Sequence, residues 1–576
     1  MARAGFSGLA HGGTEVYIET DGANASTCKC IKFLFRCPRI DLRRFCLSRI
    51  MNQAEVIWTL LILVAALAIL AKKVAIPYPV LLVIGGLGLG FVPGLPEVQL
   101  EPDMVFLFLL PPLLYPAALF TSWRDFRANL NPILLLAIGL VLLTTAFVAV
   151  VAHALTGLPL AAAFVLGAII SPPDAIAATA IANRLRLPQR IVTIVEGESL
   201  VNDATALVAY RFAIAAMVTG RFSVSEAAVR FALVALGGAV IGLAVGWLVS
   251  RIQRRLDDPP VQVTISLLTP FAAYIPAERL DVSGVLAVVA CGLFLGWRAP
   301  QILTSRTRLN LFTFWEMVVF LLNGLIFVLI GMQLSHILRT FSVQRLEQLV
   351  WLGAAISLAA ILVRIIWVFA SANARRWLSF SLNRPDPDPD WRNMAIIAWT
   401  GMRGVVSLAA ALAVPLTLSD GSPFPGRDSI VFITFSVILA TLVLQGLSLP
   451  ILIRRLGVMD DGRANLEERT ARLKANEAAL AYLAEVEGRF PADLVERLRV
   501  EYDDRIRQLE VCASTGGNRS AGLALPLYER LQQEALTVER RTIIQLRDEY
   551  IINDEVLRRI QRDLDYAEAR LHARDS

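Results

Sequence analysis

Charged residues are scarce in this sequence, and histidine and cysteine are scarcer still. Asp, Glu, Lys and Arg make up 18% of the 576 residues, whereas about a quarter is usual for a soluble domain. The 4 histidines are scattered, and most of the 6 cysteines crowd into the first fifty residues at a spacing that fits no common zinc site. The low charge excludes an ordinary soluble protein. The dispersed histidines and cysteines argue against a metalloenzyme.

Apolar sequence is abundant, since 56% of the residues are hydrophobic. A helix needs about 20 apolar residues to cross a bilayer, and about 13 segments approach or reach that length. We therefore predict an all-α polytopic membrane protein with about 13 transmembrane helices. The predicted segments are residues 54–71, 77–92, 103–120, 132–155, 159–183, 191–218, 226–250, 261–276, 282–298, 309–335, 347–371, 393–416 and 428–452.

The basic residues of the loops predict how these segments are oriented. About 17 lie in loops that follow odd-numbered segments and about 5 in loops that follow even-numbered ones. Because cytoplasmic loops carry the excess of Lys and Arg, the odd side and the C-terminus are predicted to be cytoplasmic. The same distribution accounts for the net charge of +6, so we expect no nucleic-acid partner.

Composition divides the chain into three parts. Residues 1–50 are polar and then basic, lack the order of a signal peptide and would lie on the outer face. We expect this leader to be disordered or not native, with the natural protein beginning at Met51. Residues 51–455 hold the apolar segments. Residues 456–576 are rich in Glu, Arg, Leu and Ala at helical spacing, which predicts a cytoplasmic helical domain with a regulatory role.

A carboxylate follows two prolines in the middle of segment 159–183. An ionised Asp174 at that depth costs at least about 2.5–3.5 kcal/mol, so it is expected to have a function. Pro172 and Pro173 supply no backbone N–H, and unwound backbone inside a membrane is tolerated only within protein or beside water. Its carbonyls, that of Pro173 included, are hard oxygen ligands of the kind that alkali cations bind. Ser171, just before the break, is a candidate for lining the path.

The next segment, 191–218, supplies further polar groups. Ser199 and Asp203 are four residues apart and share one helical face. Glu198 and Asn202 form a second such pair beside them. A hydroxyl and a carboxylate that face broken backbone predict a site for a small cation. The alternative is that these groups only hydrogen-bond helices together.

Two arginines lie within later segments. Arg364 requires a buried carboxylate partner, for which Glu198 is the natural candidate. Arg403 is expected to lie close to this pair. Glu198 would then be structural and permanently charged. Gly401 and Gly404 flank Arg403 and predict a second interrupted helix, and two such helices that cross are typical of a transporter site.

Two further polar residues, Glu316 and Asn323, are seven residues apart on one face of segment 309–335. They either line the ion path or bond to neighbouring helices, and the sequence favours neither.

Five motifs, taken together and in this order, resemble the monovalent cation:proton antiporters of the Na+/H+ exchanger type, both NhaP-like and animal. They cover roughly residues 54–452 and are specific as a set. The motifs are FLFLLPPLLY (106–115), SPPDAIA (171–177), EGESLVNDA (196–204), FWEMVVFLLNGLIF (314–327) and GMRGVVSLAAAL (401–412).

The resemblance implies two inverted six-helix repeats after an extra N-terminal helix, a homodimer in the lipid membrane and elevator-like alternating access. By position, Asp203 is the ion- and proton-binding carboxylate and Asn202 its partner. Ser199 is a coordinating hydroxyl, and Asp174 is the acid of the first crossed helix. The Na+ ligands implied are Asp203, Asp174 and Ser199.

The resemblance also implies that Glu198 pairs with Arg364. Two positions depart from the family pattern. Pro173 stands where members often have Thr, and Pro116 stands where some prokaryotic members have Glu, so ion preference is not carried over.

On this resemblance we expect a secondary transporter, not an enzyme, that exchanges Na+ or another monovalent cation for H+ across the plasma (inner) membrane in pH and sodium homeostasis. Na+ and H+ would occupy Asp203 in turn, without a cofactor. The Asn-Asp pair is the pattern associated with electroneutral exchange. A K+/H+ antiporter or an electrogenic exchanger is the nearer alternative. A membrane-embedded hydrolase is the remote one, because no histidine lies near Ser199.

Overall fold

The computed structural model forms two compact units, Met1–Met459 and Asp460–Ser576. The division falls close to the predicted boundary after residue 455. The predicted leader, residues 1–50, lies outside the described residues. Those described are 58–71, 73–74, 77–92, 105–185, 187–219, 224–340, 343–381, 390–418, 421–458, 463–486, 488–514 and short pieces within 535–568.

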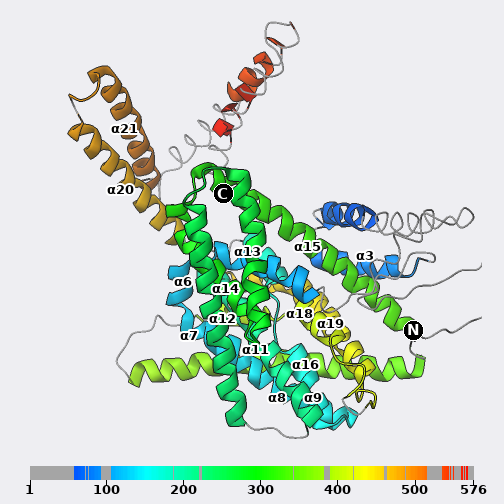
Figure 1. The fold of residues 1–576 in the computed structure, drawn as a ribbon. Helices are drawn as coiled ribbons and strands as arrows, with labels where there is room; N and C mark the ends of the chain where they lie inside the picture. The colour runs from blue at the N-terminus through cyan, green and yellow to red at the C-terminus, as the bar shows by residue number, and fades with distance from the viewer. Residues whose placement is uncertain are drawn as a thin grey trace, which may run out of the picture. The chain divides into compact units, whose positions relative to one another are not determined.

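The first unit is built of helices (Figure 1), and two of its turns, η1 and η2, are π-helical. An apolar helix, Trp58–Ala71, comes first. The following elements are α3 (Tyr78–Gly90), η1 (Val105–Leu109), α5 (Leu110–Phe120), α6 (Trp123–Ala128), α7 (Leu130–Leu134), η2 (Leu135–Leu140), α8 (Val141–Thr156), α9 (Leu160–Ile170), α10 (Ala175–Arg184), α11 (Gln189–Thr219), α12 (Val224–Gln253), α13 (Pro259–Arg279), α14 (Gly284–Ile302), α15 (Ser305–Thr340), α16 (Val343–Ser381), α17 (Trp391–Trp399), α18 (Val405–Leu412) and α19 (Arg427–Leu456). The second unit contains α20 (Arg463–Glu485) and α21 (Ala492–Ser514).

Within the described residues, 8 helical stretches are long and apolar enough to cross a membrane, and three shorter apolar helices precede them. Each predicted segment coincides with at least part of a helix. The count of thirteen crossings and the inverted repeats stay predictions. Two helices extend furthest past their predicted segments, α15 with 36 residues and α16 with 39. Their polar flanks hold no proline or glycine, so the helices continue past the apolar core.

Helices α3 and α15 approach closely because each presents a glycine at their contact. A Cβ atom on Gly86 would overlap the Val328 carbonyl, and one on Gly331 would overlap the Val83 carbonyl. In a membrane, where lipid is as apolar as Leu, such close backbone packing holds helices together.

Both predicted helix interruptions are present. The first separates α9, which ends at Ile170, from α10, which begins at Ala175. The second separates α17, which ends at Trp399, from α18, which begins at Val405. Tandem prolines account for the first break, because they lack the N–H groups that helical hydrogen bonds require. Two glycines, which are weak helix formers, account for the second.

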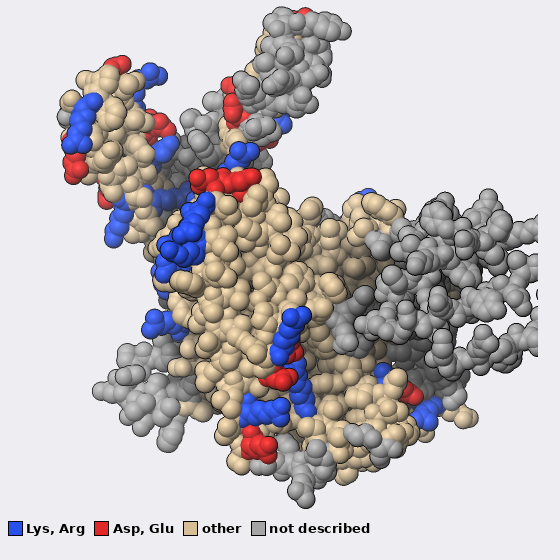
Figure 2. Space-filling view, viewed as in Figure 1, with Lys and Arg blue, Asp and Glu red and all other residues tan. Residues whose placement is uncertain are grey.

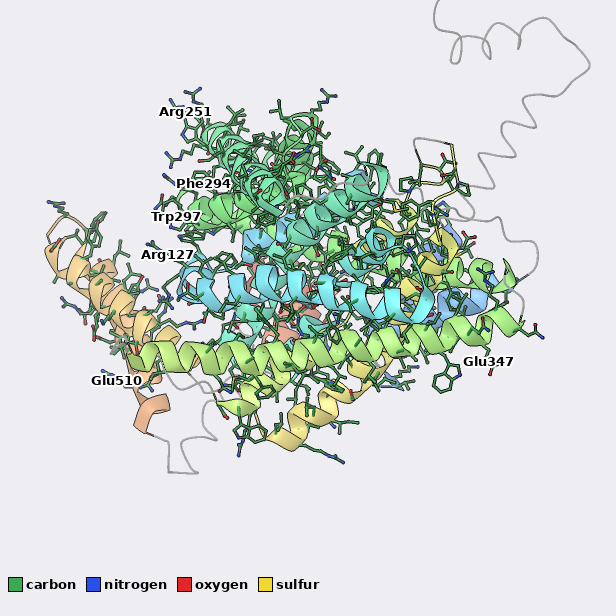
Figure 3. The ribbon with its side chains drawn as sticks, turned by 90° about the horizontal axis from the view of Figure 1, so that it is seen from below. Arg127, Arg251, Phe294, Trp297, Glu347 and Glu510 are labelled. Atoms are coloured by element: carbon green, nitrogen blue, oxygen red, sulfur yellow. The ribbon has the colours of Figure 1, made fainter. Side chains whose placement is uncertain are left out.

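Charged side chains are unevenly placed on the first unit. Figure 2 shows a visible face formed mostly by residues other than Asp, Glu, Lys and Arg, with the charges in a few patches. In Figure 3, Arg127 and Arg251 lie toward one end of the bundle and Glu347 toward the other. The two arginines belong to predicted cytoplasmic ends and Glu347 to a predicted outer end; which end is cytoplasmic stays a prediction.

Candidate ion-binding site

The two helix interruptions meet at Asp174. Its backbone N–H donates to the Met402 carbonyl, at 2.6 Å. Gly404 is so close that a Cβ atom there would overlap the Asp174 carboxylate. The broken segments of α9–α10 and α17–α18 therefore cross in contact.

The Asp174 carboxylate lies at the N-terminal ends of two half-helices. Its Oδ1 accepts a hydrogen bond from the Ile176 N–H of α10, at 2.9 Å. The Val405 N–H, the first of α18, also faces it. Helix N-termini carry partial positive charge, so both stabilise the ionised carboxylate.

Helix α11 lies against the first break through two polar side chains. The Asn202 Nδ2 group donates to the Pro173 carbonyl, at 2.8 Å, and the Ala175 N–H donates to Ser199 Oγ, at 3.4 Å. Asn202 Oδ1 is buried, and it has no hydrogen-bond partner in the part of the chain that the structure describes. That oxygen and the second lone pair of the Pro173 carbonyl are available to a ligand.

Asp203 is the second carboxylate of the crossing. It lies on α11 with 5% of its surface exposed, close enough to Asp174 for the two charges to repel. A monovalent cation or a proton bound between them relieves that repulsion. The candidate oxygen ligands are the carboxylates of Asp174 and Asp203, Ser199 Oγ, Asn202 Oδ1 and the Pro173 carbonyl.

A buried ion pair connects α11 to α16. Arg364 NH1 and NH2 donate to the two carboxylate oxygens of Glu198 at 2.5 and 2.8 Å, and both side chains are 1% exposed. Arg364 NH2 and Nε also donate to the Ile397 carbonyl near the end of α17, at 3.0 and 3.3 Å. The guanidinium thus satisfies a carbonyl at the negative end of that half-helix.

Arg403 likewise donates to a free carbonyl at the first break. Its Nε donates to the Ile170 carbonyl at the end of α9, at 3.0 Å, and its NH1 donates to the Gly401 carbonyl. It is close enough to Arg364 and Glu198 to interact with their charges. In both interrupted helices, cations face the carbonyl ends. Asp174 faces the N–H ends.

The remaining predicted residues are placed differently. Ser171 is buried, and its hydroxyl donates to the Ala168 carbonyl of its own helix, at 2.9 Å. Asn323 is buried on α15 beside Tyr78 of α3, and the Tyr78 hydroxyl is close enough to Asp174 to interact with its charge. Glu316 is exposed, and within the described residues no hydrogen bond or ion pair joins it to the crossing.

Sequence reasoning missed three groups at the crossing. Tyr78 lies in an apolar segment, and the one feature that could have indicated it is a polar hydroxyl at the start of a helix. The Met402 carbonyl and the Val405 N–H are backbone groups, and only the glycine spacing around Arg403 indicated that backbone there would be free.

An apolar recess of about 550 Å³ lies elsewhere, between α8, α9, α11 and α12. Leu142, Phe164, Phe212 and Phe231 are among its lining residues. The hydroxyl of one lining residue, Thr145, donates to the Val141 carbonyl within its own helix, at 2.8 Å. The lining is almost entirely apolar and includes no carboxylate, so the crossing of the broken helices is the better candidate for a cation site.

The charges at the crossing do not balance. If all five groups are ionised, the two guanidinium groups (Arg364 and Arg403) and the three carboxylates (Asp174, Glu198 and Asp203) sum to one net negative charge. One monovalent cation or one proton makes the set neutral. A multi-pass helical bundle with such a site at two crossed, broken helices is of the secondary-transporter class.

The chain belongs to the sodium/hydrogen exchanger family, since the model of the family described as "Sodium/hydrogen exchanger, transmembrane" matches residues 59–455. The resemblance indicated by the motifs is thereby confirmed. This is a family of transporters and not of enzymes, as predicted.

Two relatives and one solved structure illustrate the match. An uncharacterized Na+/H+ exchanger of Mycobacterium tuberculosis is 36% identical over 537 residues, covering 91% of this chain and 98% of the relative. The sodium, potassium, lithium and rubidium/H+ antiporter of Bacillus subtilis is 34% identical over 456 residues, covering 77% of this chain and 67% of the relative. The sodium proton antiporter MjNhaP1 from Methanocaldococcus jannaschii has a TM-score of 0.55 at 22% identity, over 71% of this chain and 99% of that one. This last likeness supports the fold alone.

Proposed function

We propose that this protein exchanges Na+ or another monovalent cation for H+, one for one, across the plasma membrane. The observation that carries the proposal is the single excess negative charge at the crossing of the two broken helices. Either substrate, bound at Asp203 and Asp174, brings the site to the same net charge. Exchange of one for the other is then electroneutral.

The same charge count provides the coupling. An empty site carries a net negative charge, and moving such a charge through hydrocarbon is costly. A loaded site is neutral and free to move. Only loaded carriers therefore cross, and a cation that travels one way is exchanged for a proton that travels the other. The transported ions are the cargo, and no resident cofactor is required.

The two arginines and Glu198 have a structural role in this proposal. Arg364 and Arg403 are held by carbonyls of α17 and α9 and by Glu198. Their charges offset two of the three carboxylates, which sets the site at one negative charge. Asn202 and Ser199 connect α11 to the first break and contribute oxygens.

The choice of cation has a second candidate. The Bacillus subtilis relative is named as an antiporter for sodium, potassium, lithium and rubidium, which favours a K+/H+ activity beside the Na+/H+ one. Purified protein in liposomes, supplied with each alkali cation over a pH series, distinguishes them. An imposed membrane potential distinguishes an electrogenic exchanger, because each uncompensated charge is driven by about 2.3 kcal/mol per 100 mV.

We further propose a cytoplasmic C-terminus and a homodimer. The opposite placement of Arg127 and Glu347 in Figure 3 supports the orientation. An exposed apolar stripe on α12, which includes Val229, Leu236 and Val240, supports a surface covered by lipid or by a second copy. The second unit, with α20 and α21, would be the cytoplasmic regulatory domain.

Asp203→Asn is the experiment that tests the site. Everted vesicles that contain the variant are expected to lose cation-driven proton movement, because the amide neither ionises nor exchanges a proton. Glu347→Gln makes the same chemical change at an exposed helix end and is expected to leave exchange unchanged. Substantial exchange by Asp203→Asn removes Asp203 from this role.

A further inference from the structure

Gln445 of α19 faces the second helix interruption. Thr441, Gln445 and Ser448 lie on one face of that helix. Thr441 Oγ1 accepts the Arg403 N–H, at 3.2 Å, and Ser448 Oγ accepts the Trp399 Nε1 group, at 2.8 Å. Gln445 lies between them along the helix and is therefore opposite the broken backbone between Trp399 and Arg403.

A neighbouring contact places the same stretch of α19 beside Met402. A Cβ atom added to Gly446 would lie 3.6 Å from Met402 Sδ. Met402 is the residue whose carbonyl accepts the Asp174 N–H. The stretch of α19 that holds Gln445 therefore packs beside the residue that holds Asp174.

The Gln445 side chain is completely buried, with 0% exposure. Neither its Oε1 nor its Nε2 has a hydrogen-bond partner among the residues that the structure describes. Nearby hydroxyls on α19 are satisfied, since Thr434 donates to the Ile430 carbonyl and Thr441 to the Val437 carbonyl, both at 2.8 Å. A buried amide without partners destabilises a protein strongly, so this side chain indicates a ligand.

The chemistry of the amide selects the ligand. It presents one acceptor oxygen and one donor NH2 group. A water molecule can satisfy both, whereas an alkali cation would satisfy only the oxygen. A buried water requires two to four polar partners, and the Gly401 and Met402 carbonyls each keep a second lone pair beyond the bond they already accept.

We propose that Gln445 binds a water molecule against the second broken segment and that this water positions the Met402 carbonyl, which holds Asp174. Gln445 is then a positioning residue for the ion site. The inference rests on the proposed exchange at Asp203 and Asp174. It assigns to α19 a role in cation affinity although α19 contributes no direct ligand.

Gln445→Met tests the proposal, because methionine has a similar length and no amide. The cation concentration for half-maximal exchange is expected to rise about fivefold, the effect of one lost hydrogen bond, while the maximal rate changes less. The thermal unfolding midpoint is expected to stay equal or to rise, since an apolar side chain needs no buried partner. Thr434→Val, which removes a buried hydroxyl bonded only within its helix, is the matched control and should leave the half-maximal concentration unchanged.

Each outcome bears on a separate claim. Wild-type cation affinity in Gln445→Met would overturn the role of Gln445. A cryo-EM map of the wild-type protein that resolves waters should show density within hydrogen-bond distance of both amide atoms, and its absence would overturn the proposal even if the variant did not fold. Asp203→Asn, measured alongside, tests the exchange mechanism. If Asp203→Asn is inactive and Gln445→Met has wild-type cation affinity, only the inference about Gln445 is refuted.

Discussion

Replacing Glu198 by Gln removes the carboxylate that neutralises Arg364. The guanidinium makes two hydrogen bonds to Glu198, and both side chains are 1% exposed. A glutamine keeps one oxygen and turns an NH2 group toward the guanidinium, so one bond becomes a contact between two donors. The arginine charge stays buried without its partner.

The expected loss of stability is large. Breaking a buried ion pair by removing one partner costs about 3–5 kcal/mol. Replacing both partners, as Glu198→Met with Arg364→Met, removes the unpaired charge. The remaining cost is the Ile397 carbonyl, which loses its two donors from Arg364 and costs about 1–3 kcal/mol as a buried unsatisfied group. The double variant should therefore be more stable than Glu198→Gln alone.

Thermal unfolding of the detergent-solubilised protein, followed by fluorescence-detected size exclusion, measures this order. Glu278→Gln is the control, because its pair with Arg211 is as short, at 2.7 Å, but the side chains are 29% and 53% exposed. An exposed pair contributes about 0–1 kcal/mol. The reasoning is refuted if Glu198→Gln is as stable as the wild type, or if the double variant is less stable than the single one.

Two further changes test the geometry of the crossing. Gly404→Ala places a methyl group on the Asp174 carboxylate and is expected to lower the initial rate of cation-driven proton movement at least about tenfold, or about 1.4 kcal/mol; a wild-type rate would contradict the contact between the two breaks. Asn202→Ala removes the donor of the Pro173 carbonyl and should lower stability by about 1–3 kcal/mol. An unchanged unfolding midpoint in that variant would show that the bond contributes nothing.

Local chemistry explains what could be predicted about the fold. The helical segments follow from long apolar runs. The first break follows from Pro172 and Pro173, because each lacks the N–H that a carbonyl four residues earlier in the chain would accept. The extension of α15 and α16 past their apolar segments was not predicted, because their polar flanks carry no signal that ends a helix.

The sequence by itself determined that acids would lie at membrane depth, that two helices would break and that a buried arginine would require a carboxylate, because these costs depend only on residue type and depth. Only the tertiary structure decided which groups meet. Glu198 and Arg364 are 166 positions apart, and the Met402 carbonyl reaches Asp174 only where two broken helices cross. Such contacts depend on how separate helices pack, and no local pattern in the chain encodes that packing.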